Sequence, residues 1–264
     1  MATLGLGQLT AVDVTPEEYI SIAAEVGVDS VSLFVCQPGL QAKFPLTTTE
    51  NLAAIKQRLN SSGIGVANID CFMLTPNVDV AEFLPLIDLG AQLEAQGATV
   101  LLYDNDQSRV ADHLNLLCEM ARQAGLRIGV EFMPFTPKWK NLPDTVELIR
   151  QLAIPNLGVA IDLLHLIRTG GSPKDVATID PSLISFVQLC DGISTEPADN
   201  YFAEAGIERM APGAGNFPVQ EFLQAVPADT LLELEVPQLS DLSPLERIRI
   251  IVESTRRQIR LAEI

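Results

Sequence analysis

The sequence predicts a single (β/α)8 barrel that occupies residues 1–264 as one domain. Eight short apolar segments alternate with eight amphipathic segments along the whole chain, and no linker interrupts them. The apolar segments lack the polar alternation of a half-exposed sheet, as expected of parallel strands covered on both faces. A doubly wound open sheet is the alternative, but it rarely needs eight units, and no glycine-rich fingerprint follows the first strand.

The first half of the chain contains four predicted pairs of a strand and a helix. Thr15 followed by Pro16 is a helix start, and Gly27, Gly63 and Gly125 each follow the end of a predicted helix. The predicted strands are residues 4–10, 31–35, 64–71 and 99–103. The predicted helices are residues 15–27, 49–59, 80–96 and 110–124.

The second half repeats the same order with one interruption. The predicted strands are residues 127–132, 157–162, 183–189 and 231–236. The predicted helices are residues 142–152, 173–179, 217–225 and 244–262. Between them, residues 191–216 form one long connection without a clear element, and connections of this length in compact domains are usually functional.

Composition excludes several classes of partner and site. With 17 basic and 34 acidic residues the chain carries a formal charge of −17, which repels nucleic acid and anionic lipid. Its two histidines cannot build a site that needs three imidazoles. Four separated cysteines, the lack of a basic leader and the absence of an apolar run of roughly 18 residues predict a reduced, cytoplasmic protein with no membrane partner.

Polar side chains stand at the ends of four consecutive predicted strands. Glu131, Asp162, Gln188 and Glu235 come from the fifth to the eighth strand, and strand ends converge at the mouth of a barrel, where active sites lie. Carboxylates gathered in a partly dry site repel one another unless a cation neutralises them. Oxygen ligands favour Mg²⁺ or Mn²⁺ over Zn²⁺. We therefore expect these four residues to hold a divalent metal ion.

Several runs of residues resemble the motifs of the xylose isomerase-like TIM barrel superfamily, in order and over most of the chain. This superfamily includes sugar phosphate isomerases and epimerases, inosose and 3-dehydroshikimate dehydratases, and the family 2 AP endonucleases. The runs are GVEFMPF, GVAIDLLHLIRTGG, FVQLCDG, ERMAPGAGNFPVQEFL and LELEVPQ.

The resemblance implies a metal held by Glu131, Asp162, Gln188 and Glu235, with His165 beside it as a catalytic residue that hydrogen-bonds the substrate. Gln188 departs from the family, because most members carry His at this position, although some dehydroshikimate dehydratases resemble this chain in using Gln. A resemblance to the endonuclease branch would imply a trinuclear zinc site rich in histidine. The two histidines of this chain cannot supply such a site.

Further residues are candidates for substrate binding. Arg209 matches a position where family members often carry a substrate-facing Arg, with a solvated loop charge as the alternative. Lys138 and Trp139 follow the fifth strand and could bind an anionic group or stack on an apolar face, or be an ordinary exposed loop. Asp191 could orient Gln188 or a substrate hydroxyl. Glu233 shares a strand face with Glu235, and is either a supporting residue or the true ligand.

These residues predict an isomerase or epimerase of a sugar or related polyol or hydroxy-ketone. The metal would polarise the carbonyl, and Glu131 or Glu235 would move the proton of the adjacent carbon through an enediolate. The alternatives are a lyase that dehydrates a cyclic hydroxy-ketone such as 3-dehydroshikimate or an inosose, and a barrel that only binds a polyol. The residues leave phosphorylated and neutral substrates both open, and the resemblance implies a homo-oligomer.

Overall fold

Eight parallel strands close into a barrel in chain order. The structure is a computed structural model, and it describes residues 3–37, 43–193 and 200–263. Each strand pairs with its sequence neighbours, and the first pairs with the last, so the predicted fold class is confirmed. The strands are β1 Leu4–Gly7, β2 Ser30–Phe34, β3 Gly65–Leu74, β4 Gly97–Leu102, β5 Arg127–Glu131, β6 Leu157–Asp162, β7 Ile184–Leu189 and β8 Leu232–Leu234.

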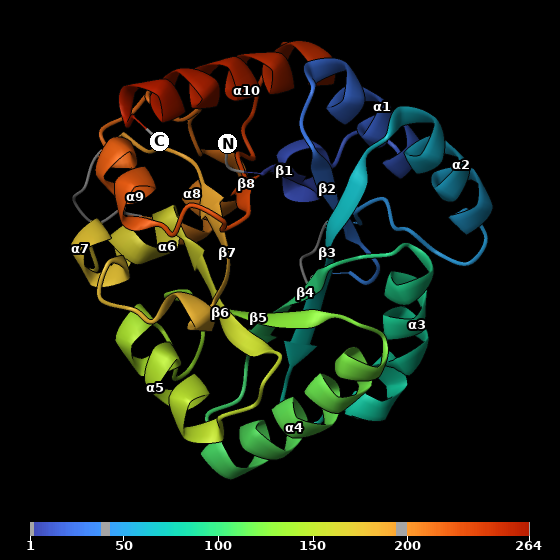
Figure 1. Ribbon diagram of the computed structural model, residues 1–264, viewed down its shortest axis with the longest axis vertical. Helices are drawn as coiled ribbons and strands as arrows, with labels where there is room; N and C mark the ends of the chain where they lie inside the picture. Colours follow the sequence, from blue (N-terminus) through green and yellow to red (C-terminus); the bar gives the residue numbers. More distant parts are fainter. Residues whose placement is uncertain (1–2, 38–42, 194–199, 264) are drawn as a thin grey trace.

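Helices form a ring around this barrel (Figure 1). Their inner faces supply a continuous layer of buried aliphatic and aromatic side chains against the outside of the strands. The α-helices are α1 Pro16–Val26, α2 Leu52–Ser62, α3 Leu84–Gln92, α4 Gln107–Gln123, α5 Leu142–Leu152, α6 Leu163–Arg168, α7 Pro173–Val176, α8 Tyr201–Ile207, α9 Val219–Ala225 and α10 Pro244–Leu261. Short 3₁₀ helices are η1 Gln8–Ala11, η2 Val80–Phe83 and η3 Pro181–Leu183.

Local sequence signals explain where the first helices begin and end. The Thr15 hydroxyl accepts a hydrogen bond from the Glu18 N–H at 3.3 Å, Pro16 is the first helical residue, and Gly27 closes α1 with a φ of 75°. Gly63 ends α2 in the same way with a φ of 71°. Gly27 and Gly63 close these helices as expected, because such helix ends depend on residues a few positions apart, but α2 spans Leu52–Ser62 and not the predicted 49–59.

The structure corrects several predicted elements. The strand predicted at 4–10 ends at Gly7, where η1 follows, and the helix predicted at 173–179 is only α7, preceded by the unpredicted α6. The helix predicted at 80–96 is two elements, η2 and then α3, and it stops at Gln92. The connection at 191–216 contains α8, which begins where Asn200 accepts a hydrogen bond from the Ala203 N–H at 3.2 Å, while residues 194–199 lie outside the described part. The strand predicted at 231–236 is only β8, so Glu235 stands one residue beyond it.

The register of the last strands places polar side chains side by side inside the barrel. Asp162 of β6 pairs with Gln188 of β7, and Gln188 pairs with Glu233 of β8. Partners in a parallel register point to the same side of the sheet. All three side chains are buried, with exposed fractions of 0%, 3% and 0%. Asp162, Gln188 and Glu233 therefore form a row of polar side chains inside the barrel, called the polar row below.

No helix in the described ranges is long and apolar enough to cross a lipid bilayer.

Asp191 organises the connection between β7 and α9. Its Oδ1 accepts hydrogen bonds from the N–H groups of Gly192 and Phe217 at 2.8 and 2.9 Å. Its Oδ2 accepts from Gly213 and Gly215 at 2.8 and 3.0 Å. The carboxylate is 1% exposed, so it replaces water for four backbone donors.

We expect Asp191→Ala to lower the free energy of unfolding by about 2–4 kcal/mol. The substitution leaves four backbone N–H groups without the charged acceptor that they bind in the folded protein. Urea unfolding measures this loss. Asp241→Ala removes an exposed carboxylate and is the control, with an expected change within about 0.5 kcal/mol. Equal effects of the two substitutions would contradict this role of Asp191.

Candidate metal centre and active site

A cavity of about 130 Å³ opens at the carboxyl ends of the strands. Its polar side consists of Asp70, Glu131, His165, Gln188, Arg209 and Glu235. Its apolar side includes Phe34, Leu101, Tyr103, Met133, Phe135 and Phe202. A larger cavity of about 650 Å³ lies at the opposite end of the strands, where Asn68 and Arg127 line it without a cluster of carboxylates. The acidic cavity is therefore the candidate active site.

Glu131, Asp162 and His165 form a cluster that could hold a metal ion. One potential ligand atom from each lies within 4.8 Å of the others, and all three side chains are buried. His165 Nε2 stands 3.4 Å from Glu131 Oε1, whereas His165 Nδ1 is buried with no hydrogen-bond partner in the described part. The geometry thus brings together two of the four expected ligands and the expected catalytic histidine.

Asp162 joins the end of β6 to the start of α6. Its Oδ1 accepts hydrogen bonds from the N–H groups of Leu164 at 2.6 Å and His165 at 3.2 Å, so it caps the helix that carries His165. Its Oδ2 lies 2.5 Å from Arg209 Nη1. The cap fixes the position of the imidazole relative to the carboxylate.

Arg209 is a buried cation between two of the expected metal ligands. Its guanidinium lies 2.5 Å from Asp162 Oδ2 and 3.0 Å from Glu235 Oε2, and its Nε donates to the Ala205 carbonyl oxygen at 2.9 Å. Because its side chain is only 2% exposed, these are not ion pairs weakened by solvent. Arg209 lines the cavity, as expected, but its first partners are the carboxylates of this chain.

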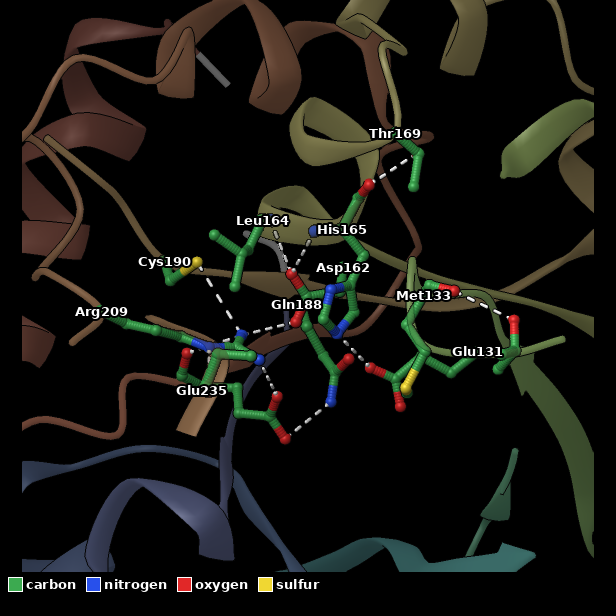
Figure 2. Close-up of polar contacts among 12 residues, drawn as sticks. Glu131, Met133, Asp162, Leu164, His165, Thr169, Gln188, Cys190, Arg209 and Glu235 are labelled. Atoms are coloured by element: carbon green, nitrogen blue, oxygen red, sulfur yellow. Dashed lines mark hydrogen bonds and ion pairs between the residues drawn. The ribbon is translucent and has the colours of Figure 1, made fainter. Parts of the chain in front are cut away.

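Gln188 lies between Glu235 and Glu131 (Figure 2). Its Nε2 donates to Glu235 Oε1 and Glu233 Oε1, both at 3.0 Å. Its Oε1 is buried and has no hydrogen-bond partner in the described ranges. A buried acceptor without a donor is satisfied by a cation as well as by a hydrogen bond. Gln188 Oε1 is thus a free acceptor near the cluster of Glu131, Asp162 and His165, whereas both oxygens of Glu235 already have partners in Gln188 and Arg209.

Burial sets the protonation of the cavity. It raises the pKa of Glu131, and it raises the pKa of Glu235 to about 8 despite the nearby Arg209. Burial also raises the pKa of Asp162, but the charges of Arg209 and His165 and the hydrogen bonds from Arg209 and from the His165 N–H together outweigh it and leave that pKa below its ordinary value. Burial lowers the pKa of His165 to about 4, so the imidazole is neutral at pH 7.

Three residues expected to bind substrate lie elsewhere. Trp139 is buried at 4% exposure, and Lys138 Nζ lies over its ring at 4.9 Å and donates to Gln107 Oε1 at 3.1 Å. Neither is among the described residues that line the cavity. Asp191 is also absent from that lining, because its carboxylate is turned into the loop that it organises. Apolar packing and backbone donors, which sequence position does not show, determine these placements.

The sequence did not single out the apolar side of the cavity. Phe135 stacks edge to face on His165 at 6.0 Å and on Phe202 of α8 at 5.7 Å. The run GVEFMPF places Phe135 four residues after Glu131, which could have pointed to it. Asp70, which also lines the cavity, accepts a hydrogen bond from the Thr99 hydroxyl at 2.6 Å.

The sequence profile of the xylose isomerase-like TIM barrel family matches residues 20–258. The chain belongs to this family. Two curated relatives are 3-dehydroshikimate dehydratases. The protein from Pseudomonas aeruginosa is 31% identical over 119 residues, 45% of this chain and 18% of its own length. The protein from Pseudomonas putida is 29% identical over 194 residues, 67% of this chain and 28% of its own length. The chain thus spans less than a third of either relative.

Solved structures of xylose isomerase-like barrels share the fold. A fusion protein of such a barrel with 4-hydroxyphenylpyruvate dioxygenase is 22% identical, with a TM-score of 0.80 over 99% of this chain and 42% of its own. The IOLI protein, described with a zinc atom, is 14% identical, with a TM-score of 0.79 over 98% of this chain and 97% of its own. A D-psicose 3-epimerase is 14% identical, with a TM-score of 0.69 over 98% of both chains.

We expect the metal-free protein to lose stability as pH rises from 6.5 to 8. In this window folded Glu235, with a pKa of about 8, still binds a proton that the unfolded state, with a pKa near 4.5, has lost. His165 contributes a small opposite slope near pH 6.5, where its unfolded form is still half protonated, and none by pH 8, where it is neutral in both states. Urea unfolding at several pH values measures the slope.

Glu235→Gln should reduce this dependence, because the amide does not titrate, while Glu131, whose pKa burial also raises, retains part of it. Glu119→Gln, an exposed glutamate of α4, should keep the wild-type slope. The prediction is wrong if Glu235→Gln and the wild type lose stability in parallel between pH 6.5 and 8.

Proposed function

We propose that this barrel is a metal-dependent lyase that dehydrates a small cyclic hydroxy-ketone of the 3-dehydroshikimate kind. The cavity carries the proposal, because it sets Glu131 and Glu235 against an apolar side made largely of aromatic rings. The two curated relatives, both 3-dehydroshikimate dehydratases, support the lyase over the isomerase that the sequence alone favoured. The sequence had retained this reaction as its alternative.

The size and lining of the cavity favour a single ring. Its volume is about 130 Å³, and an apolar cavity of about 150 Å³ accepts a benzene-sized molecule. Phe34, Phe135 and Phe202 offer no hydrogen bonds to the hydroxyl groups of an open-chain sugar. Such rings pack well against the face of a carbocycle, which becomes flatter as it loses water.

The metal ligands in this proposal are Glu131, Asp162, Gln188 and Glu235. They provide oxygen atoms alone, which favours Mg²⁺ or Mn²⁺ over Zn²⁺. The bound ion would polarise the substrate carbonyl and acidify the neighbouring C–H bond. Arg209 would help to orient the substrate, since it lines the cavity beside Glu235.

The residues of the chain move the protons. One of the cavity glutamates takes the proton from the carbon next to the carbonyl, and that C–H electron pair becomes the new C=C bond. The β-hydroxyl leaves with a proton from the second acid of the site, so that the sum of the steps is the loss of one water. Neutral His165, held by the Asp162 cap and packed on Phe135, hydrogen-bonds the substrate oxygen.

An epimerase is the second candidate. Figure 2 shows Glu131 and Glu235 on opposite sides of Gln188 and His165. Two carboxylates in this arrangement could deprotonate one face of a carbon and reprotonate the other. In that reaction a hydrogen atom of the substrate exchanges with solvent, and the substrate does not lose water.

We expect the protein loaded with Mn²⁺ to convert 3-dehydroshikimate to an unsaturated product that absorbs ultraviolet light. Glu131→Gln should lower kcat/KM by about 10²–10⁴-fold, because it removes a group that moves protons and holds the metal. Absorbance and mass spectrometry of the product measure the reaction. Glu119→Gln on the outer helix α4 should leave the rate unchanged.

Reaction in heavy water separates the two candidates. A lyase yields a product lighter by one water, whereas an epimerase returns substrate that carries solvent deuterium. Recovery of unlabelled, unchanged substrate from a panel of cyclic and open-chain hydroxy-ketones, with Mn²⁺ bound, would contradict both.

A further inference from the structure

Glu233 is a fully buried carboxylate below the active-site cavity. Its side chain is 0% exposed, and it is not among the described residues that line the cavity. It lies on β8, two residues before Glu235, and pairs in register with Gln188 of β7. It therefore sits beside Gln188 inside the barrel without contacting the space that a substrate fills.

Three side chains from three other strands donate to this carboxylate. Gln188 Nε2 of β7 donates to Oε1 at 3.0 Å. Asn68 Nδ2 of β3 donates to Oε2 at 3.3 Å, and the Ser32 hydroxyl of β2 donates to the same oxygen. Gly7 of β1 leaves room, because a Cβ there would stand 3.1 Å from Oε1. Oε2 thus anchors the glutamate, and Oε1 is directed at Gln188.

This contact decides which way the Gln188 amide faces. An amide has a donor end and an acceptor end of nearly equal shape, so packing alone does not select its orientation. The Nε2 end faces two carboxylate oxygens, and the flipped amide would place its carbonyl oxygen against them. The Oε1 end is consequently turned away from Glu233, buried and without a hydrogen-bond partner in the described ranges.

Glu235 cannot perform this orienting role independently of the site. Its Oε2 is bound to Arg209 at 3.0 Å, and it lines the cavity where substrate and metal would act. Glu233 has no such contact among the interactions of the described residues, since its donors are Ser32, Asn68 and Gln188. The hydrogen bond between Glu233 and the Gln188 amide therefore does not involve the space that a substrate or a metal ion would occupy.

We propose that Glu233 is a positioning residue that orients the Gln188 amide, so that Gln188 Oε1 is presented as a ligand to the divalent metal ion. This role rests on the metal site of the proposed function and extends it to a residue outside the ligand set. Groups that orient metal ligands by hydrogen bonds typically change metal affinity when they are removed. An imidazole ligand commonly receives the same support from a carboxylate.

The test measures the Mn²⁺ dissociation constant of metal-stripped protein by calorimetry. Glu233→Met keeps most of the volume but removes the acceptor, and we expect it to weaken Mn²⁺ binding about 10–100-fold. Glu233→Gln removes the charge but keeps a carbonyl oxygen for Gln188, so it should retain most of the affinity. Ser32→Ala removes a donor from the opposite oxygen and should have the smallest effect.

A double-mutant cycle isolates the route of the effect. In a Gln188→Ala background no amide remains to be oriented, so Glu233→Met should not weaken Mn²⁺ binding further. An equal weakening in both backgrounds would overturn the proposal. Equal losses for Glu233→Gln and Glu233→Met would also overturn it, because the charge and not the hydrogen bond would then be responsible.

A measurement on the wild type keeps the test independent of the folding of any variant. The side-chain amide protons of Gln188, assigned with Gln188→Ala, should exchange with solvent far more slowly than those of exposed Gln123. Exchange at the same rate overturns the orienting contact. Wild-type protein that binds no Mn²⁺ overturns the proposed function, whereas wild-type binding that Glu233→Met leaves unchanged overturns the role of Glu233 alone.

Discussion

The burial of several carboxylates inside one barrel is the constraint on which the rest of the site depends. Asp162 and Glu233 are 0% exposed, and Glu131 is 7% exposed. A buried charge without compensation is so costly that the group would take up a proton or the fold would open. Here the compensation comes from Arg209, from the first N–H groups of α6 and from the amides of Gln188 and Asn68.

The arginine that compensates the buried carboxylate charges also links the mouth of the barrel to its interior. Arg209 binds Asp162 and Glu235 with one end of its guanidinium and the Ala205 carbonyl of α8 with its Nε. The same helix carries Phe202, which packs on Phe135 over His165. Arg209 thus contacts both the carboxylates and the helix that carries the aromatic side of the cavity, and Arg168 of α6 also holds this helix through Glu204.

The eight-unit fold and the convergence of Glu131, Asp162, Gln188 and Glu235 at one end of it could be predicted, because apolar periodicity and the parallel topology determine both. Helix ends at Gly27 and Gly63 could be predicted from local chemistry. Helix α8 could not, because it is seven residues long and depends on its contacts with the barrel. Lys138 and Asp191 were expected at the cavity, but hydrogen bonds to Gln107 and to backbone N–H groups, which the sequence does not show, hold them elsewhere.

The Gln188 amide shows how strand register determines the orientation of a side chain in the site. An imidazole would offer nitrogen to a metal, and its shape would limit how it can lie, whereas an amide offers oxygen and must be oriented by its neighbours. The register that places Gln188 beside Glu233 supplies this orientation, and the pair follows directly from strand pairing inside a closed barrel. In this chain, the inward carboxylate of Glu233 lies at the same level of the next strand and accepts a hydrogen bond from the Gln188 amide. In the proposed site, the polar row inside the barrel would support the ligand set by orienting Gln188.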